Sequence, residues 1–240
     1  MGRRPKHSYV VRTPVEVPEE PALPAGPPPD HISPRRYYRF LAALAQRQPD
    51  LAVVLEDVND PFNLSAVLRT CDAVGVGTVH LLYTEERPPR ISRRVAGSAQ
   101  KWLTLRLHRS VEETYAALRA QGMRVYATGI TEQALDPHTV DWTHPAAIVL
   151  GNENRGVSPE ALAEADEVVF IPMRGMVQSV NVTVAAAMLL YEAQRQRLEA
   201  GFYDAPRLPE MEWQAILSRW LARERDRRRK GRIRRDADQD

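Results

Sequence analysis

Apolar segments that alternate with amphipathic helices from residue 51 onward constrain the fold of this chain more than any other feature. Leu51–Leu55 is an uninterrupted apolar run, which is typical of a parallel strand buried on both faces. After a break at residues 59–63, residues 64–74 carry one apolar stripe at helical spacing, made of Leu64, Val67, Leu68, Cys71 and Val74. The pattern predicts an α/β domain with a mostly parallel sheet.

The same alternation continues toward the C-terminus. We predict further strands at 78–83, 103–107, 124–129, 146–151 and 167–172, and helices at 35–47, 111–121, 158–165, 182–200 and 211–229. Ser158 followed by Pro159 indicates a helix start, with serine as the N-cap and proline in the first turn. The segment 180–184 is ambiguous, because three valines alternate there with polar residues as in a strand, whereas the following residues are strongly helical.

Composition narrows the class of protein. The chain is 43% hydrophobic, and no apolar run approaches the eighteen or so residues of a membrane span. Its basic N-terminus is followed by proline-rich sequence without an apolar stretch, so we expect no secretory signal and a cytoplasmic protein. The single cysteine, Cys71, cannot form an internal disulfide and is expected to be a buried thiol. The histidines are scattered, so no metal site is expected.

Charge is distributed unevenly along the chain. Residues 219–235 hold ten Arg or Lys against two acids, whereas the whole chain carries a net charge of only +2. A block of this kind favours a polyanionic partner, although a solvated tail is the simpler alternative. Residues 1–34 contain nine of the nineteen prolines, which predicts an extended segment whose basic start could touch RNA.

Three polar segments follow predicted strands, where open α/β sheets place their ligands. They are residues 63–70 with Asn63 and Arg69, residues 151–156 with Glu153, and residues 171–187 with Ser179 and Asn181. No glycine fingerprint or Walker loop is present, so a Rossmann dehydrogenase and a P-loop NTPase lack their main evidence.

Each of these residues also has a purely structural interpretation. Arg69 lies opposite the apolar stripe and three residues before Asp72, so it could be an exposed arginine in a weak ion pair. Asn63 is a natural N-cap, Glu153 an ordinary turn residue, and Ser179 and Asn181 could simply begin a helix. Met173 and Met176 could fill gaps in the core, since the connection around them is expected to be buried.

In order and spacing, the three segments resemble the signature motifs of the SpoU/TrmH family of RNA ribose 2′-O-methyltransferases, over roughly residues 50–210. Residues 192–208 resemble the C-terminal extension of its tRNA-specific branch. The resemblance implies a SPOUT α/β knot, with helices on both faces of a mostly parallel sheet and a deep trefoil knot in the C-terminal half. It divides the chain into a flexible extension (1–34), an N-terminal helix (35–50), a catalytic domain (51–200) and a basic helical extension (201–240).

The resemblance also implies a site and a reaction. The catalytic pocket, at the interface of a homodimer, would be formed by Asn63, Arg69, Glu153, Ser179 and Asn181. The helix that starts within the third segment would begin near Ser179. S-adenosylmethionine would be held by Thr128, Gly151, Ile171, Met173, Ser179 and Val180, and RNA phosphates by the N-terminal helix, the basic tail, Arg195 and Arg197. Arg174 departs from the apolar residue that is common at its position.

We expect Arg69 to remain charged, because a guanidinium hardly deprotonates, and to stabilise the 2′-oxygen as negative charge develops on it. Its assignment as the base is the alternative. The implied substrate is a tRNA, at the D-loop guanosine numbered 18 in tRNA convention. An rRNA methyltransferase is the nearest alternative, but only about fifty residues precede the first strand, too few for its usual RNA-binding domain. A non-catalytic RNA-binding protein on the same fold is the other alternative.

Overall fold

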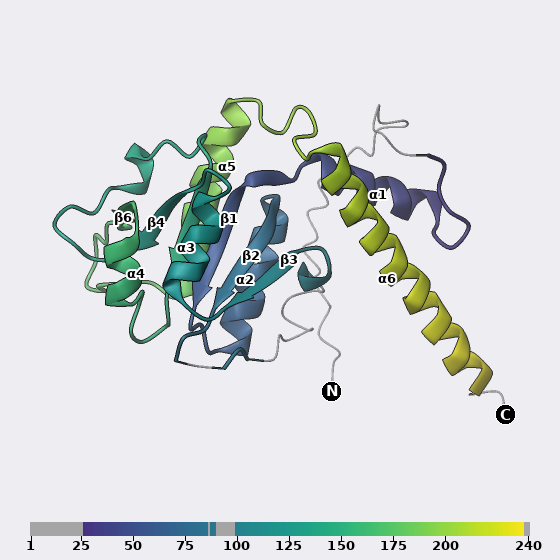
Figure 1. Cartoon of the computed structure of the whole chain (residues 1–240), viewed down its shortest axis with the longest axis horizontal. Coiled ribbons are helices and arrows are strands. Elements are labelled where there is room, and N and C mark those ends of the chain that lie inside the picture. Colours follow the sequence, from purple (N-terminus) through teal and green to yellow (C-terminus); the bar gives the residue numbers. More distant parts are fainter. Residues whose placement is uncertain (1–25, 86, 90–98, 238–240) are drawn as a thin grey trace, which may run out of the picture.

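A computed structural model describes residues 26–85, 87–89 and 99–237 of the chain. Its centre is a six-stranded parallel sheet in the order β3-β2-β1-β5-β4-β6 (Figure 1). The strands are β1 (Gln48–Glu56), β2 (Val76–Leu82), β3 (Thr104–His108), β4 (Arg124–Thr128), β5 (Ala146–Leu150) and β6 (Glu167–Val169). The predicted mostly parallel α/β sheet is therefore confirmed.

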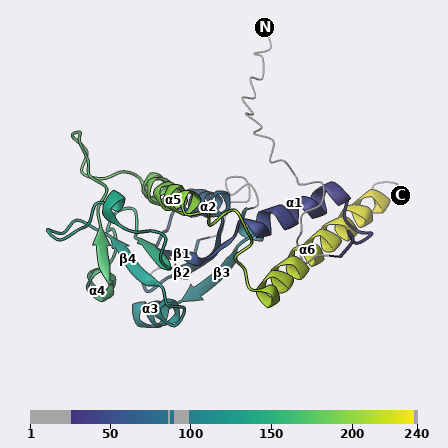
Figure 2. The ribbon, with the colours of Figure 1, turned by 90° about the horizontal axis from the view of Figure 1, so that it is seen from above.

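Helices cover both faces of the sheet (Figure 2). One face carries α2 (Pro61–Ala73) and α5 (Val182–Glu199), and the other carries α3 (Val111–Arg119) and α4 (Pro159–Glu164). Strand β1 serves both layers, because Leu51, Val53 and Leu55 join the core under α2 and α5, whereas Ala52 and Val54 join the core under α3 and α4. This two-sided burial explains why β1 is an unbroken apolar run.

The first and last helices form a separate small core beside the sheet. Helix α1 (Pro34–Ala45) packs against α6 (Glu210–Ala237), which extends away from the body of the molecule (Figure 1). Two tryptophans of α6, Trp213 and Trp220, are buried there in one cluster with Phe40 and Leu44 of α1. The two ends of the described chain therefore stabilise each other.

The predicted elements are all present, but two helix starts differ from the prediction. Asn63 is not the N-cap of α2, because the helix begins at Pro61 and the Asp60 carboxylate accepts the Phe62 N–H at 2.6 Å. The expectation that α5 starts near Ser179 is also wrong, and residues 180–184 form no strand. The helix begins at Val182, because the Asn181 side chain caps it by accepting the Thr183 N–H at 2.8 Å.

The expectations for Ser158 and Cys71 are borne out. Ser158 caps α4 with Pro159 in the first turn, and Cys71 is buried, which raises the pKa of its thiol to about 12. Two 3₁₀ turns, η1 (Ala99–Lys101) and η2 (Pro137–Thr139), complete the described structure. None of the described helices is long and apolar enough to cross a membrane. The described residues include no cluster of His, Cys, Asp or Glu suited to a metal ion. The basic start of the chain, which we expected to be extended and able to touch RNA, lies outside the described residues.

Candidate active site

The carboxylate of Glu153 and the side-chain amide of Asn63 together link the three polar segments at the C-terminal ends of β1 and β5. The Glu153 carboxylate accepts a hydrogen bond from Asn63 Nδ2 at 3.0 Å, and from the backbone N–H groups of Asn59 and Asp60 at 3.3 Å each. The Oδ1 atom of Asn63 in turn accepts a hydrogen bond from Asn181 Nδ2 at 3.3 Å. Three predicted site residues from three distant segments are therefore in one hydrogen-bonded chain.

The loop that carries Glu153 is held by a residue that the sequence did not single out. Asn152 is buried, and its Nδ2 donates to the Asp57 carbonyl at 2.8 Å. Its Oδ1 accepts the backbone N–H groups of Asn154 and Arg155 at 2.9 and 3.2 Å. Such an inward-facing asparagine directly after a buried strand is a signal that could have identified it.

Gly151 has a packing reason to be glycine. A Cβ atom at this position would lie 2.1 Å from the carbonyl carbon of Gly156, because the two ends of the loop pair through the backbone of Asn152 and Gly156. No side chain fits at that distance. The resemblance placed Gly151 beside the cofactor, and the structure shows that a glycine is needed there to close this loop.

Arg69 lies on the exposed surface of α2, less than two turns beyond Asn63. It makes no hydrogen bond or ion pair with any described residue. The interpretation of Arg69 as a partner of Asp72 is wrong, because Asp72 pairs with Arg47, whose Nη2 is 2.6 Å from Asp72 Oδ1. The guanidinium of Arg69 is therefore available for a ligand.

Residues 171–180 form an exposed connection, which corrects the expectation of a buried one. Ser179 and Arg174 are exposed, Met176 is fully so, and Ile171, Met173 and Val180 are half-buried. Within the described chain, the backbone groups of 171–180 form no backbone hydrogen bond of a turn or a helix. Thr128, at the end of β4, donates to the Val149 carbonyl at 2.9 Å. Open backbone donors and acceptors therefore border the strand ends.

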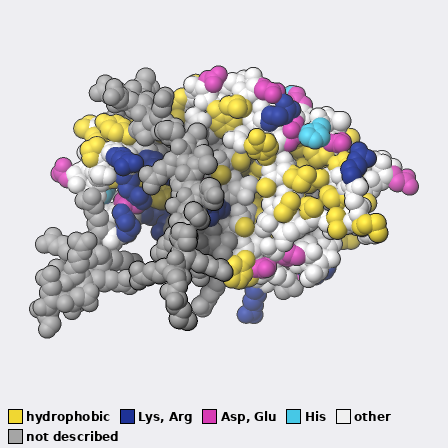
Figure 3. All heavy atoms as spheres, turned by 180° about the vertical axis from the view of Figure 1, so that it is seen from behind, with side chains coloured by type: hydrophobic (Ala, Val, Ile, Leu, Met, Phe, Trp, Pro, Cys, Tyr) yellow, Lys and Arg dark blue, Asp and Glu magenta, His cyan; other side chains and the backbone are white. Residues whose placement is uncertain are grey.

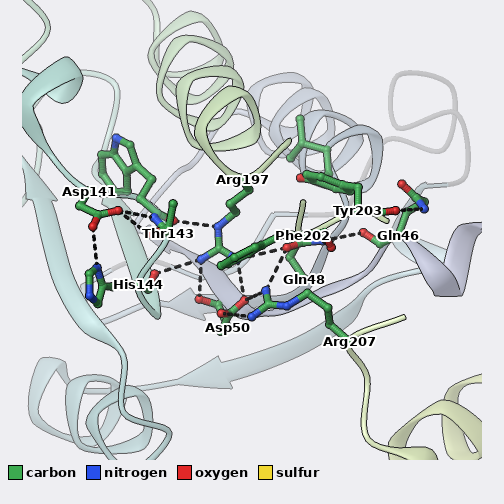
Figure 4. Close-up of polar contacts among 12 residues, drawn as sticks. Gln46, Gln48, Asp50, Asp141, Thr143, His144, Arg197, Phe202, Tyr203 and Arg207 are labelled. Carbon is green, nitrogen blue, oxygen red and sulfur yellow. Dashed lines mark hydrogen bonds and ion pairs between the residues drawn. The ribbon is translucent and has the colours of Figure 1, made fainter. Parts of the chain in front are cut away.

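The expected RNA contact of Arg197 is wrong in this structure, because its side chain is 0% exposed. Its Nη1 lies 2.5 Å from Asp50 Oδ1, and its other nitrogens donate to the carbonyls of Trp142 and His144 (Figure 4). Arg207 binds the same Asp50 carboxylate at 2.7 Å. Arg197 thus fastens the C-terminal segment to the start of β1.

Arg195, one of the two arginines assigned to RNA, remains at the surface. Its guanidinium pairs with Glu192 and Glu199, at 2.8 Å from each carboxylate. The hydrogen bond from Arg195 lowers the pKa of Glu192 to about 2. The contact of Arg195 with RNA stays a prediction.

An apolar stripe runs along the exposed side of α5. Val184, Met188, Tyr191 and Leu198 follow one another at helical spacing, with between 44% and 70% of each residue exposed. Figure 3 shows hydrophobic side chains gathered on the face of the molecule that α2 and α5 form. Large contiguous apolar patches are typical of interaction sites.

Comparison with known proteins identifies relatives of this chain. The sequence profile of the SpoU rRNA Methylase family matches residues 50–191. The tRNA (guanosine(18)-2′-O)-methyltransferase of Thermus thermophilus is 50% identical over 186 residues, which are 78% of this chain and 95% of the relative.

Solved structures agree with the sequence comparison. The A. aeolicus TrmH/SpoU tRNA modifying enzyme superposes with a TM-score of 0.75 at 38% identity, covering 79% of this chain and 96% of that one. AviRb from Streptomyces viridochromogenes, in complex with the cofactor AdoMet, gives 0.56 at 26% identity and covers 65% and 62%. Because the profile spans more than half of the chain and a relative is 50% identical over most of it, the chain belongs to the SpoU rRNA Methylase family.

Proposed function

We propose that this protein is an S-adenosylmethionine-dependent methyltransferase that modifies the ribose 2′-oxygen of the D-loop guanosine at tRNA position 18. The observation that carries the proposal is the hydrogen-bonded convergence of Glu153, Asn63 and Asn181. Arg69 lies on the same helix as Asn63, is exposed, and has no partner among the described residues. The Thermus relative with the same named activity spans 78% of the chain, which supports a tRNA rather than an rRNA substrate. A tRNA substrate is consistent with a cytoplasmic enzyme.

The residues at the strand ends fit S-adenosylmethionine. Backbone groups of residues 171–180 have no backbone partner in the described chain, so they are free to bind an adenine ring and an amino-acid end. Ile171 and Met173 offer half-buried apolar surface beside them. The AviRb structure with AdoMet supports the same cofactor here. When bound, the cofactor supplies a cationic sulfonium whose methyl group needs no metal for activation.

The side chains of this chain supply alignment and charge. Arg69 binds a phosphate near the target ribose and stabilises the 2′-oxygen as its charge develops. Asn181 and Ser179 orient the ribose at the start of α5. Glu153 is occupied by three hydrogen bonds, so its function is to hold Asn63 and the start of α2 in place.

We infer a homodimer with the site at its interface, as the resemblance implies. The apolar stripe of α5 and the exposed Met176 and Val177 support this, because they expose apolar surface that a second copy would cover. We infer that the chain between β5 and α5 forms the expected knot. The return of α5 from the sheet edge at β6 to pack on α2 is consistent with it.

The RNA-binding surface is proposed to lie on α1 and α6. Arg35 and Arg39 of α1 and Arg225 and Arg229 of α6 are exposed, and none of them has an acidic partner among the described residues. Arginines of this kind bind RNA phosphates without reading sequence.

The test is methyl transfer from labelled S-adenosylmethionine to unmodified tRNA and rRNA transcripts, with the product mapped by nucleotide. We expect a 2′-O-methyl group at guanosine 18, and a loss on the order of 100-fold in single-turnover rate in Arg69→Ala, as for removal of one oxyanion donor. Labelling of rRNA alone would contradict the tRNA assignment. RNA binding without transfer to either RNA would make the non-catalytic alternative correct.

A further inference from the structure

Arg69 has a carboxylate within reach on its own helix. Asp72 lies three residues further along α2, and side chains at this spacing are neighbours on a helix surface. An arginine and an aspartate at these positions attract each other weakly. The side chain of Asp72 is 30% exposed, so it remains accessible to a second cation.

Asp72 pairs with Arg47 instead of with Arg69. The Nη2 atom of Arg47 is 2.6 Å from Asp72 Oδ1 and 3.4 Å from the Trp102 carbonyl, and its Nη1 atom is 2.9 Å from the Val76 carbonyl. The guanidinium also lies over the ring of Trp220 in α6, 5.5 Å from its centroid. Only 3% of the Arg47 side chain is exposed, so these contacts fix it in one position.

Arg47 and Arg69 therefore differ in what surrounds them, although both are arginines beside the same carboxylate. Arg47 reaches Asp72 from the buried side and is held there by the two carbonyls and the Trp220 ring. Arg69 is exposed and unpaired among the described residues. Since a buried ion pair is screened less than an exposed one, the Asp72 carboxylate favours Arg47.

We propose that Arg47 is a positioning residue of the methyl-transfer site, which occupies Asp72 and so leaves Arg69 free to bind the substrate. The proposal rests on the proposed function, in which Arg69 contacts the reacting ribose. Arg47 itself touches neither RNA nor cofactor. Loss of Arg47 leaves an unpaired carboxylate next to Arg69, and that carboxylate draws the guanidinium away from the RNA.

The test compares two variants that break the same ion pair from opposite sides. Arg47→Gln removes the cation and leaves the carboxylate, whereas Asp72→Asn removes the carboxylate and leaves the cation. Both lose the buried pair, so both lower the melting temperature. Only Arg47→Gln creates a competitor for Arg69. Single-turnover methyl transfer to tRNA and S-adenosylmethionine affinity are measured for both, and for the double variant Arg47→Gln/Asp72→Asn.

We expect Arg47→Gln to lower the single-turnover rate roughly three- to fivefold, the upper end of the range that one exposed ion pair produces. Asp72→Asn keeps a rate within about twofold of the unmodified protein despite its lower melting temperature, and the double variant returns to the Asp72→Asn rate. S-adenosylmethionine affinity stays unchanged in all three variants.

Two results would overturn the proposal. Equal rate losses in Arg47→Gln and Asp72→Asn that follow the melting temperature would make the pair purely structural. A double variant as slow as Arg47→Gln would mean that Asp72 does not capture Arg69. Arg69→Ala in the same assay separates this from failure of the proposed function. If Arg69→Ala transfers methyl groups at the normal rate, the role of Arg69 itself is wrong.

Discussion

At the scale of single residues, burial decides what a charged or polar side chain can do. Arg69 and Arg197 are both arginines that the resemblance assigned to RNA or catalysis, yet one is exposed and unpaired among the described residues and the other is fully buried on Asp50. His80 is, like Arg197, an ionisable side chain that is buried. It is 0% exposed, its Nδ1 lies 2.9 Å from His108 Nε2, and its Nε2 has no partner among the described residues.

His80 makes stability depend on pH. Burial, followed by the nearby His108 and Arg106, lowers its pKa to about 4, whereas an unfolded histidine has a pKa of about 6.5. Between these values the unfolded chain binds the proton and the folded chain does not, so stability falls as pH decreases through this window. We expect the free energy of unfolding to fall between pH 7 and pH 4 by on the order of 3 kcal/mol more than in His80→Gln.

The measurement is urea unfolding at each pH, followed by circular dichroism. Glu112→Gln, an exposed change on α3, is the control and leaves the pH dependence unaltered. Parallel curves for the unmodified protein and His80→Gln would contradict the burial argument.

At the scale of elements, side-chain caps fix where the helices of the site begin. Asp60 caps α2 and Asn181 caps α5, and each side chain accepts the N–H two residues later. The two caps set the positions of Asn63 and Thr183, on which the hydrogen bonds of the site depend. The residues at which α2 and α5 begin therefore determine where the side chains of the site lie.

Loss of the α2 cap should lower stability by an amount typical of such caps. We expect Asp60→Ala to cost about 1 kcal/mol, because the Phe62 N–H loses its acceptor. Asp60→Asn should cost much less, since asparagine caps nearly as well. Chemical denaturation of the three proteins tests this. Equal losses in the two variants would mean that the charge of Asp60, and not its capping bond, stabilises the helix.

The carboxylate of Asp50 holds the segment that joins α5 to α6, through ion pairs with Arg197 and Arg207. Burial alone would raise the pKa of Asp50, but hydrogen bonds from Arg207 and Arg197 lower it overall. Both guanidiniums also lie over the Phe202 ring, at 3.9 Å for Arg207 and 5.4 Å for Arg197. Asp50 thus connects the start of β1 to the segment that leads to α6 (Figure 4).

Asp50→Asn should destabilise the protein at neutral pH by about 3 kcal/mol, because it leaves the buried Arg197 without a counter-charge. A carboxylate with a lowered pKa stabilises the fold above its unfolded pKa of about 3.9, and that contribution is lost as pH falls below it. The difference between the two proteins therefore shrinks below about pH 4. Thermal unfolding at neutral pH and below about pH 4 measures the difference. Glu199→Gln, which breaks only an exposed pair, is the control. A constant difference at all pH values would contradict this account.

At the scale of the whole molecule, the described residues pack into three hydrophobic cores. Two cores lie on the two faces of the sheet, whose central strands β1 and β5 carry the site at their C-terminal ends, and the third joins α1 to α6. The α5 stripe belongs to none of these cores in a single chain. Its surface is the part of the molecule that the proposed dimer would bury.

We expect Met188→Glu to convert the dimer into a monomer at micromolar concentration, because a symmetric interface would place two unpaired carboxylates in an apolar contact. Met211→Glu is the control, since Met211 is also exposed but lies on α6. Sedimentation equilibrium measures the mass of each protein. A monomeric unmodified protein, or a dimer that survives Met188→Glu, would contradict the interface.

The sequence by itself determined the layers of this fold. Leu51–Leu55 predicted a strand buried on both faces, and the periodic apolar residues of 64–74 predicted the helix beside it, because burial imposes its period directly on the chain. The resemblance of the three polar segments to the family motifs implied which residues would meet, and of these Asn63, Glu153 and Asn181 do.

Only the tertiary structure decided which charged groups are occupied. Asp72 pairs with Arg47 from outside its helix rather than with Arg69 on it, and Arg197 is bound by Asp50, 147 residues away. Asp60 rather than Asn63 caps α2 because the proline between them starts the helix earlier. Local periodicity carries no information about partners that are distant in sequence, and ion pairs depend on those partners because charge is stabilised by whatever lies nearest in space.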